Sequence, residues 1–265
     1  MQRLTIHGQP LEVRLIEGSG AMAPIVYLHE GLGSVSQWTQ RGLDWPLAVC
    51  RATGRAGVVY SRRGYGQSQP APLGRHTLQP DYMHREAFEV LPDLLAQLHI
   101  QKPVVLGHSD GATIALLYAS QFDVTACVAM APHVLVEKIA LTAIGRAKQA
   151  FESGDLRQRL AKHHADPDGA FWQWNDVWLS DRFASFDIRA ECRCITAPLL
   201  LVQGIDDAYG TMRQLDEIAL AAPHAQQLRL AGCGHSPHRD QPQATLDSVV
   251  GFLKQKNQRY VKRSC

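Results

Sequence analysis

The sequence predicts an α/β fold with a mostly parallel central sheet flanked by helices. Short apolar runs alternate with helix-like segments over most of the 265 residues, and this alternation is typical of parallel sheets with helical crossovers. Hydrophobic residues make up 45% of the chain, which is enough to bury a large core. The length corresponds to one or two domains.

The charge balance narrows the classes of partner. Lys and Arg total 27 and Asp and Glu total 25, so the formal net charge is only +2. Nucleic-acid binding usually needs a clustered basic surface, which this composition does not indicate. No apolar stretch approaches the ~18 residues of a membrane-spanning helix, and the N-terminus has no apolar run typical of a secretory signal. We therefore expect a soluble globular protein without nucleic-acid or membrane partners, and the sequence does not indicate its oligomeric state.

The six cysteines predict neither a disulfide scaffold nor a metal site. They include one C-x-C and no C-x-x-C, and the twelve histidines form no H-E-x-x-H. Metal sites usually show such paired spacings. The interpretation that fits best is a cytoplasmic protein whose cysteines stay reduced and mostly pack inside.

In the first half of the chain, the first two apolar runs predict a β-hairpin. Residues 4–8 and 11–17 are separated by a Gly-Gln-Pro turn. Residues 24–29 and 57–62 are apolar runs bounded by Gly-rich turns, and they predict buried parallel strands. Residues 81–98 have the pattern of a helix, although a proline interrupts its middle.

In the second half, a strand at 103–108 is followed at once by a helix at 111–121. Further strands are expected at 124–131, 198–204 and 227–231, and further helices at 211–222 and 241–255.

One long segment lacks any strand signal. Roughly 65 residues separate the strand ending near 131 from the strand starting at 198, whereas α/β connections usually have about 2–6. Residues 139–164 have a charged helical pattern, and residues 171–178 contain three of the five Trp. We interpret 134–197 as a helical cap inserted into a single core formed by 1–133 and 198–265.

The strongest chemical signal is a G-x-S-x-G match between a strand and a helix. It reads Gly107-His108-Ser109-Asp110-Gly111. Glycines on both sides let the chain turn sharply enough to expose the hydroxyl of Ser109 on a strained elbow. The helix that begins there directs backbone N–H groups at the site, where they stabilise developing negative charge.

A serine nucleophile needs a base and an acid that orients the base. Asp206 and Asp207 follow the strand expected at 198–204, and His235 lies on a Gly-rich loop after the last strand. Only one of the two carboxylates can reach the imidazole. The spacing alone leaves both acids open.

With these motifs, the chain resembles the α/β-hydrolase fold superfamily over nearly its whole length. Residues 27–34 (Y-L-H-E-G-L-G-S), followed by Trp38, look like the oxyanion loop after strand three. Residues 61–68 (S-R-R-G-Y-G-Q-S) look like the D-x-R-G-x-G-x-S turn after strand four. The cap expected at 134–197 falls between strands six and seven, where this family inserts its cap.

The resemblance implies roles for particular residues. The family pattern puts the acid three residues after the glycine that ends strand seven, which selects Asp207 over Asp206. By position, the oxyanion hole consists of the N–H groups of Gly31 and Asp110, and Glu30 and Leu32 are alternatives to Gly31.

Two positions depart from the family pattern. Glu30 replaces a glycine, and Ser61 replaces an aspartate. A carboxylate at position 30 would oppose an oxyanion unless it is paired or turned away, and Arg62 or Arg63 is the partner we expect.

Several residues are candidates for substrate binding. Phe171, Trp174 and Trp178 share one helix face by their spacing, and they either line an acyl pocket or only attach the cap to the core. His133 and Tyr209 follow strand ends near the site. Together with Leu32, they complete the set of candidate contacts: Leu32, His133, Trp174, Trp178 and Tyr209.

The sequence therefore predicts a serine hydrolase that cleaves a small carboxylic ester through an acyl-enzyme. A thioesterase and a carbon–carbon bond hydrolase would use the same residues and remain alternatives. The expected partner is a small-molecule ester or thioester substrate. A ligand-sensing receptor on the same fold is the alternative from another class. There is no G-x-G-x-x-G after a strand and no phosphate loop, so we expect no cofactor.

Overall fold

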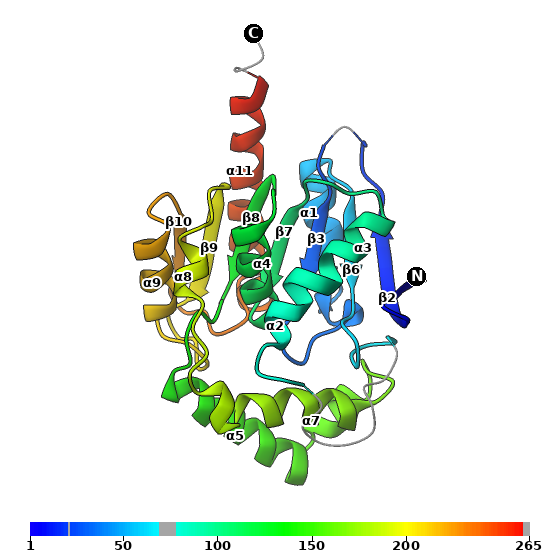
Figure 1. Cartoon of the computed structure of the whole chain (residues 1–265), viewed down its shortest axis with the longest axis vertical. Helices are drawn as coiled ribbons and strands as arrows, with labels where there is room; N and C mark the ends of the chain where they lie inside the picture. The colour runs from blue at the N-terminus through cyan, green and yellow to red at the C-terminus, as the bar shows by residue number, and fades with distance from the viewer. Residues whose placement is uncertain (21, 69–77, 262–265) are drawn as a thin grey trace.

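A computed structural model describes residues 1–20, 22–68 and 78–261 of the chain. Eight strands form one sheet in the order β1-β2-β6-β3-β7-β8-β9-β10. β1 and β2 form the predicted antiparallel hairpin, β2 pairs with β6 antiparallel, and every other pairing in this sheet is parallel. The predicted α/β class is thereby confirmed (Figure 1).

The strand bounds lie within about two residues of the predicted runs. They are β1 (Gln2–Ile6), β2 (Gln9–Ile16), β3 (Ile25–Leu28), β6 (Gly57–Tyr60), β7 (Val104–His108), β8 (Ala126–Met130), β9 (Leu199–Gly204) and β10 (Gln226–Leu230).

Three short elements between β3 and β6 are absent from the sequence prediction. β4 (Thr39–Gln40) and β5 (Leu43–Asp44) form a small antiparallel ribbon, and α1 (Trp45–Thr53) follows directly. The Asp44 side chain caps α1 by accepting from the Leu47 N–H, which satisfies a donor at the helix start.

Helices cover both faces of the sheet, and alternate residues of each strand face opposite layers. Val104 and Leu106 of β7 pack with α1 and α11 (Pro242–Val261). Val105 packs on the other side, with α3 (Leu91–Gln97), α4 (Asp110–Gln121) and α9 (Arg213–Ala221). α11 continues beyond residue 255, where the sequence pattern had ended it.

The helix predicted at 81–98 is divided into three parts. α2 (Tyr82–Arg85) leads into a π-helical turn (Glu86–Val90), and α3 follows. Pro92 lies in the first turn of α3. A proline has no N–H to donate to the preceding turn, and the wider π turn accommodates this interruption without ending the helix.

The segment between β8 and β9 is helical, as its pattern predicted. It contains α5 (Lys138–Ser153), α6 (Leu156–Leu160), α7 (Pro167–Trp178), a 3-10 turn (Asp181–Phe183) and α8 (Arg189–Cys192). We call residues 134–197 the helical segment. Figure 1 shows α5 and α7 lying across one end of the sheet, and Trp174 of α7 packs on Gly31 just after β3.

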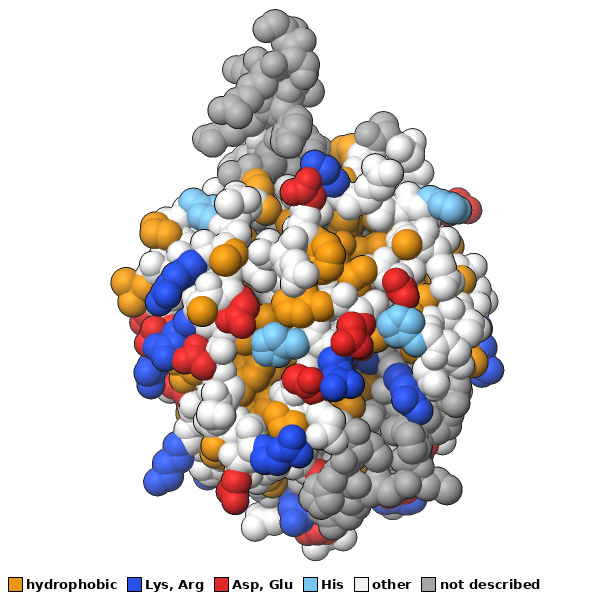
Figure 2. Space-filling view, in the orientation of Figure 1, with side chains coloured by type: hydrophobic (Ala, Val, Ile, Leu, Met, Phe, Trp, Pro, Cys, Tyr) orange, Lys and Arg blue, Asp and Glu red, His pale blue; other side chains and the backbone are white. Residues whose placement is uncertain are grey.

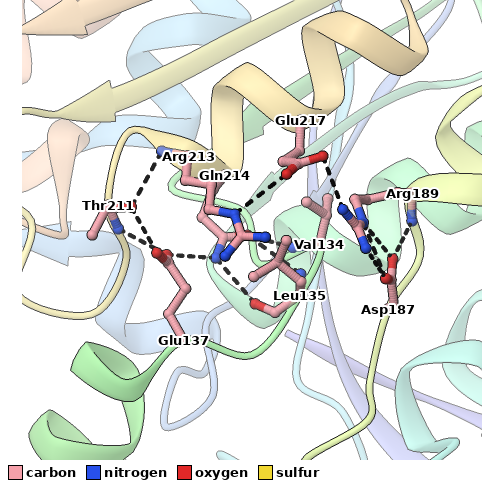
Figure 3. Close-up of polar contacts among 9 residues, drawn as sticks. All are labelled: Val134, Leu135, Glu137, Asp187, Arg189, Thr211, Arg213, Gln214 and Glu217. Atoms are coloured by element: carbon pink, nitrogen blue, oxygen red, sulfur yellow. Dashed lines mark hydrogen bonds and ion pairs between the residues drawn. The ribbon is translucent and has the colours of Figure 1, made fainter.

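The two ends of the helical segment are tied to each other and to α9 (Figure 3). The Ile188 N–H donates to the Val134 carbonyl at 2.8 Å. The Gln214 side chain of α9 accepts from the Val134 N–H at 2.7 Å and donates to the Leu135 carbonyl and the Glu137 carboxylate. One fully buried amide therefore holds the first connecting strand, and Glu217 of α9 binds the second through Arg189.

Charged side chains do not separate by sign on the face drawn in Figure 2. Lys and Arg are interspersed with Asp and Glu across it. In the part of the chain that the structure describes, no helix combines the length and the apolar character that crossing a membrane requires.

Replacing Gln214 by Leu should destabilise the protein by about 2–4 kcal/mol, because buried N–H and carbonyl groups of the connection would lose their partner. Urea denaturation measures this loss. The control is Gln226→Leu at an exposed position of β10, which should change stability by less than about 0.5 kcal/mol. Equal effects of the two substitutions would contradict the anchoring role of Gln214.

Candidate active site

Ser109 lies at the sharp turn between β7 and α4. Its backbone is left-handed, with φ 55°, a conformation that non-glycine residues rarely adopt. A Cβ atom on Gly107 would lie 2.0 Å from the Gly111 carbonyl oxygen, and one on Gly111 would lie 2.0 Å from the Leu28 oxygen. Only glycine fits at these two positions, which explains the G-x-S-x-G spacing physically.

The structure brings Ser109, His235 and Asp207 into one hydrogen-bonded chain. The Ser109 Oγ lies 2.9 Å from His235 Nε2, and His235 Nδ1 lies 2.9 Å from both carboxylate oxygens of Asp207. Asp206 is exposed, whereas Asp207 is buried. Asp207, the acid selected by the family resemblance, is thus the one that contacts the imidazole.

Asp207 is held as a carboxylate. Burial alone would raise its pKa, but the hydrogen bond and charge of His235 and the Tyr209 N–H outweigh burial and lower the pKa below its usual value. The Gln203 side chain also donates to Asp207, at 3.1 Å. These donors fix the carboxylate so that it faces His235.

Two backbone N–H groups beside Ser109 are available to an oxyanion. Within the described residues, neither the Gly31 N–H nor the Asp110 N–H donates to a turn or loop carbonyl or to a side chain. Three donors converge instead on the Glu30 carbonyl: Gly33 N–H at 3.0 Å, Arg62 Nη2 at 2.9 Å and His29 Nδ1 at 2.7 Å. These bonds hold the loop that presents Gly31.

The prediction that Arg62 or Arg63 pairs with the Glu30 carboxylate is wrong. Arg62 binds the backbone carbonyl of Glu30, whereas the carboxylate pairs with Arg239 Nη2 at 2.5 Å and with His108 Nδ1 at 3.2 Å. Burial would raise the pKa of Glu30, but Arg239 and His108 hold it well below the usual value. Arg239 lies far along the chain, so sequence proximity could not identify it.

The second departure, Ser61, is compensated by a carboxylate from another strand. Glu12 of β2 accepts from the Ser61 hydroxyl at 2.7 Å and from the Gln67 N–H at 2.9 Å. The Ser61 Oγ in turn accepts from the Val35 N–H. Glu12 therefore supplies the acceptor that an aspartate at position 61 would have supplied.

The side chain of Asp110 points away from the elbow, as its position predicts. It accepts from the Tyr82 hydroxyl at 2.5 Å and lies 3.8 Å from Arg62 Nη2. The Trp178 Nε1–H donates to the same Tyr82 oxygen at 3.1 Å. Tyr82 was not identified from the sequence, because nothing in the helical pattern of its segment marks one tyrosine as polar.

Four of the candidate substrate contacts surround the nucleophile and base. The Tyr209 ring lies 4.6 Å from the His235 ring, and the His133 ring lies 5.6 Å from it on another side. Trp178 packs on His133, and the Trp174 indole covers Gly31. Phe171, by contrast, stacks on Phe151 inside the helical segment.

Leu32, the fifth candidate contact, is fixed by a residue that the sequence analysis did not single out. His164, between α6 and α7, donates Nε2–H to the Leu32 carbonyl at 3.0 Å and accepts from the Gly66 N–H at 2.9 Å. The helical segment thereby contacts both loops at the site. A histidine in a charged helical pattern gives no sequence signal for this role.

A cavity of about 270 Å³ lies beside Tyr82. Its lining joins the turn after β6, α2 and α7, and includes Arg62, Tyr65, Tyr82, Glu86 and Gln173. Because Tyr82 also binds Asp110, the cavity lies next to the residue that follows Ser109. We define the candidate active site as Ser109, His235, Asp207, the loop of Gly31 and the rings around them.

Comparisons with known proteins agree with this fold. The model of the alpha/beta hydrolase family matches residues 25–248. The mouse sn-1-specific diacylglycerol lipase ABHD11 is 26% identical, over 92% of this chain and 85% of its own length. Esterase YbfF of Escherichia coli strain K12 is 24% identical, over 62% of this chain and 72% of its own length. The enol-lactonase of Burkholderia xenovorans LB400 superposes with a TM-score of 0.73 at 18% identity, over 95% of this chain and 99% of the enzyme.

The protein is therefore a hydrolase enzyme with a mostly parallel α/β sheet. The chain belongs to the alpha/beta hydrolase family, and the family resemblance drawn from its motifs is confirmed.

The two adjacent acids provide a test of the site. Asp207→Asn should lower kcat by about 10²–10⁴, because the amide favours the wrong tautomer of His235. Asp206→Asn should lower kcat by less than about 10-fold. Steady-state kinetics at one pH compare the two variants. The reverse ranking would mean that Asp206 orients His235. Mild effects of both substitutions would mean that neither aspartate does.

The buried histidines predict that stability falls in acid. Burial lowers the pKa of His164 from 6.5 to about 4, so the unfolded chain takes up this proton more readily than the folded chain. The free energy of unfolding should therefore decrease as the pH falls from 6.5 toward 4, by about 3 kcal/mol for this residue alone.

Urea denaturation of the wild type and of His164→Gln between pH 7 and pH 4 measures the contribution of His164. The variant should lose less stability over this range than the wild type. If the free energies of unfolding of the two proteins change equally with pH, the pKa of His164 does not differ between the folded and unfolded states.

Proposed function

We propose that this hydrolase is a serine esterase that cleaves a small carboxylic ester through an acyl-enzyme. The observation that carries the proposal is the chain Ser109–His235–Asp207, with 2.9 Å at each link, built on a left-handed elbow. A serine hydroxyl bonded to an imidazole that a buried carboxylate orients is the arrangement that activates a serine for acyl transfer.

In the proposed reaction, the Ser109 Oγ attacks the ester carbonyl while His235 Nε2 takes the hydroxyl proton. Asp207 stabilises the resulting imidazolium through Nδ1. The N–H groups of Gly31 and Asp110 donate to the oxyanion of the tetrahedral intermediate. His235 then protonates the leaving alcohol, the acyl-enzyme remains on Ser109, and a water activated by His235 releases the acid and restores the serine.

The helical segment is proposed to act as a cap over the substrate. Trp174, Trp178, His133, Tyr209 and Leu32 would contact it. Trp174 meets Gly31 so closely that a Cβ there would lie 2.1 Å from the indole nitrogen. Large rings from α7 beside the oxyanion loop would form the apolar wall of an acyl pocket. The described cysteines are free thiols, which supports the proposed cytoplasmic location.

Esters are the first choice because the lipase and the esterase among the relatives bear ester-cleaving names. Thioester hydrolysis and carbon–carbon bond hydrolysis would use the same residues and are the alternatives within the enzyme class. A ligand-sensing receptor would retain its ligand with slow turnover.

A fluorophosphonate probe tests the nucleophile. The probe should label Ser109 in the wild type and leave Ser109→Ala unlabelled, and peptide mass spectrometry identifies the modified residue. Hydrolysis of p-nitrophenyl esters, with acyl-CoA thioesters in parallel, then compares the substrate classes. Labelling of a different serine, or tight ligand retention without turnover, would contradict the proposal.

The proposed acyl pocket predicts a change in selectivity. Trp174→Ala should shift the preference of the enzyme toward longer acyl chains, by about 10-fold in the ratio of kcat/KM values, because one ring can discriminate by about 1–3 kcal/mol. Trp172→Ala, on the same helix but packed on Phe151, is the matched control and should leave the preference unchanged. A uniform loss for all esters with a lower Tm would mean that Trp174 only packs.

A further inference from the structure

A buried polar cluster lies behind the catalytic chain and takes no part in the mechanism above. It joins Glu30 of the oxyanion loop, His108 at the end of β7 and Arg239 of α10 (Pro237–Asp240). Glu30 occupies the position where a glycine was expected. A carboxylate so close to an oxyanion hole calls for a physical explanation.

The contacts of His108 reach the backbone of the proposed base. His108 Nε2 lies 2.7 Å from the carbonyl oxygen of His235, and His108 Nδ1 lies 3.2 Å from Glu30 Oε2. The His108 side chain is only 1% exposed. One imidazole therefore bridges the loop that carries His235 and the loop that carries Glu30.

Both neighbours of this imidazole are acceptors. A peptide carbonyl has no proton to donate, and Glu30 is held as a carboxylate by Arg239 and His108. A ring nitrogen of His108 faces each of the two acceptors, so this one side chain can bind both loops.

We propose that Glu30 and His108 are positioning residues, and that the polar contact between them aligns the general base with the oxyanion loop. This inference rests on the proposed function. His108 directly precedes Ser109, Glu30 directly precedes Gly31, and the His235 carbonyl completes the bridge. One connection thus fixes the nucleophile, the oxyanion donor and the base relative to one another.

The other titratable groups around His108 are three histidines and an arginine, and the His235 ring lies 5.2 Å from the His108 ring. The His238 ring lies 4.8 Å from the His108 ring, and burial keeps the pKa of His238 well below its usual value, so His238 is neutral. The His133 ring also stays neutral, because burial lowers its pKa to about 3. Arg239 adds positive charge, but it binds the opposite oxygen of Glu30.

Nitrogen NMR of the histidine rings tests the contact between Glu30 and His108 directly. The ring signals of His108, assigned by their loss in His108→Ala, should shift in Glu30→Gln, because an amide that can donate to Nδ1 replaces a carboxylate that only accepts. His108 signals that keep their wild-type positions in Glu30→Gln would overturn the proposal, whatever the activity of the enzyme.

Kinetics test the positioning role. Glu30→Ala should lower kcat for ester hydrolysis about 10–100-fold with KM changed by less than about 3-fold, because small misplacements of catalytic groups cost about this much. Glu30→Gln, which keeps a partner for both His108 and Arg239, should recover most of this loss.

Glu217→Ala is the matched control, since Glu217 also pairs with two arginines, Arg189 and Arg213, away from the site (Figure 3). It should leave kcat unchanged. If Glu30→Ala retains wild-type kcat while Ser109→Ala is inactive, the positioning role fails and the esterase proposal stands. If the wild type hydrolyses no ester, the esterase proposal fails, and the NMR result still decides whether Glu30 contacts His108.

A separate observation points to a bound water beside this cluster. A cavity of about 10 Å³ lies between the oxyanion loop and α10, about the room that the centre of one water molecule needs. Four of its lining residues carry a buried polar atom without a partner within the described residues: Gln37 Oε1, Trp38 Nε1, His238 Nδ1 and Arg239 Nε.

We infer that one structural water occupies this cavity. Trp38 and Arg239 present N–H donors, while Gln37 and neutral His238 present acceptors. Two donors and two acceptors match the four hydrogen bonds of a water molecule. A cation would be repelled by Arg239, and an anion would find two acceptors facing it.

A crystal structure at about 1.5 Å resolution, with a second crystal soaked in bromide, tests this site. One water peak should lie about 2.7–3.2 Å from at least three of the four atoms. An anomalous bromide peak would mean that the cavity selects anions. The absence of any peak, or direct pairing of the four atoms with one another, would also overturn the inference.

Discussion

The left-handed backbone of Ser109 is the constraint on which the rest of the site depends. A non-glycine residue holds this conformation only where its surroundings fix it, and here the surroundings are the glycines on both sides, β8 and the start of α4. The Ser109 N–H donates to the Met130 carbonyl at 2.9 Å. The elbow is thus anchored to the neighbouring strand, and the hydroxyl points out of the sheet toward His235.

The surrounding polar groups are arranged so that each buried charge has partners from distant parts of the chain. Glu12 of β2 accepts a hydrogen bond from the turn after β6, and Glu30 binds Arg239 of α10. Unpaired buried charges are costly, so a substitution at one such position requires a complementary residue elsewhere. The two departures from the family pattern are therefore linked to residues that a local motif does not include.

Much of the architecture could be predicted because it follows from local patterns. Apolar runs marked every strand of the main sheet, and glycine spacing marked the elbow at Ser109. The ribbon of β4 and β5 and the helix α1 were missed, because elements of two to nine residues give little periodicity. Glu30–Arg239, Tyr82–Asp110 and His164–Leu32 were not predictable, because each pair forms only when the fold brings separate segments together.

The attachment of the helical segment has a consequence for how the protein exchanges small molecules with water. Its first connecting strand is tied to α9 through the fully buried Gln214, its second through the pair of Arg189 with Glu217, and His164 ties its middle to the core. Swinging the whole segment outward would break these bonds together and expose apolar surface, which makes this motion costly. Ligand entry and departure should then rely on rotamer changes of individual side chains at the rim, on the nanosecond scale of such motions, and the amides of the connecting strands should be protected from exchange with solvent.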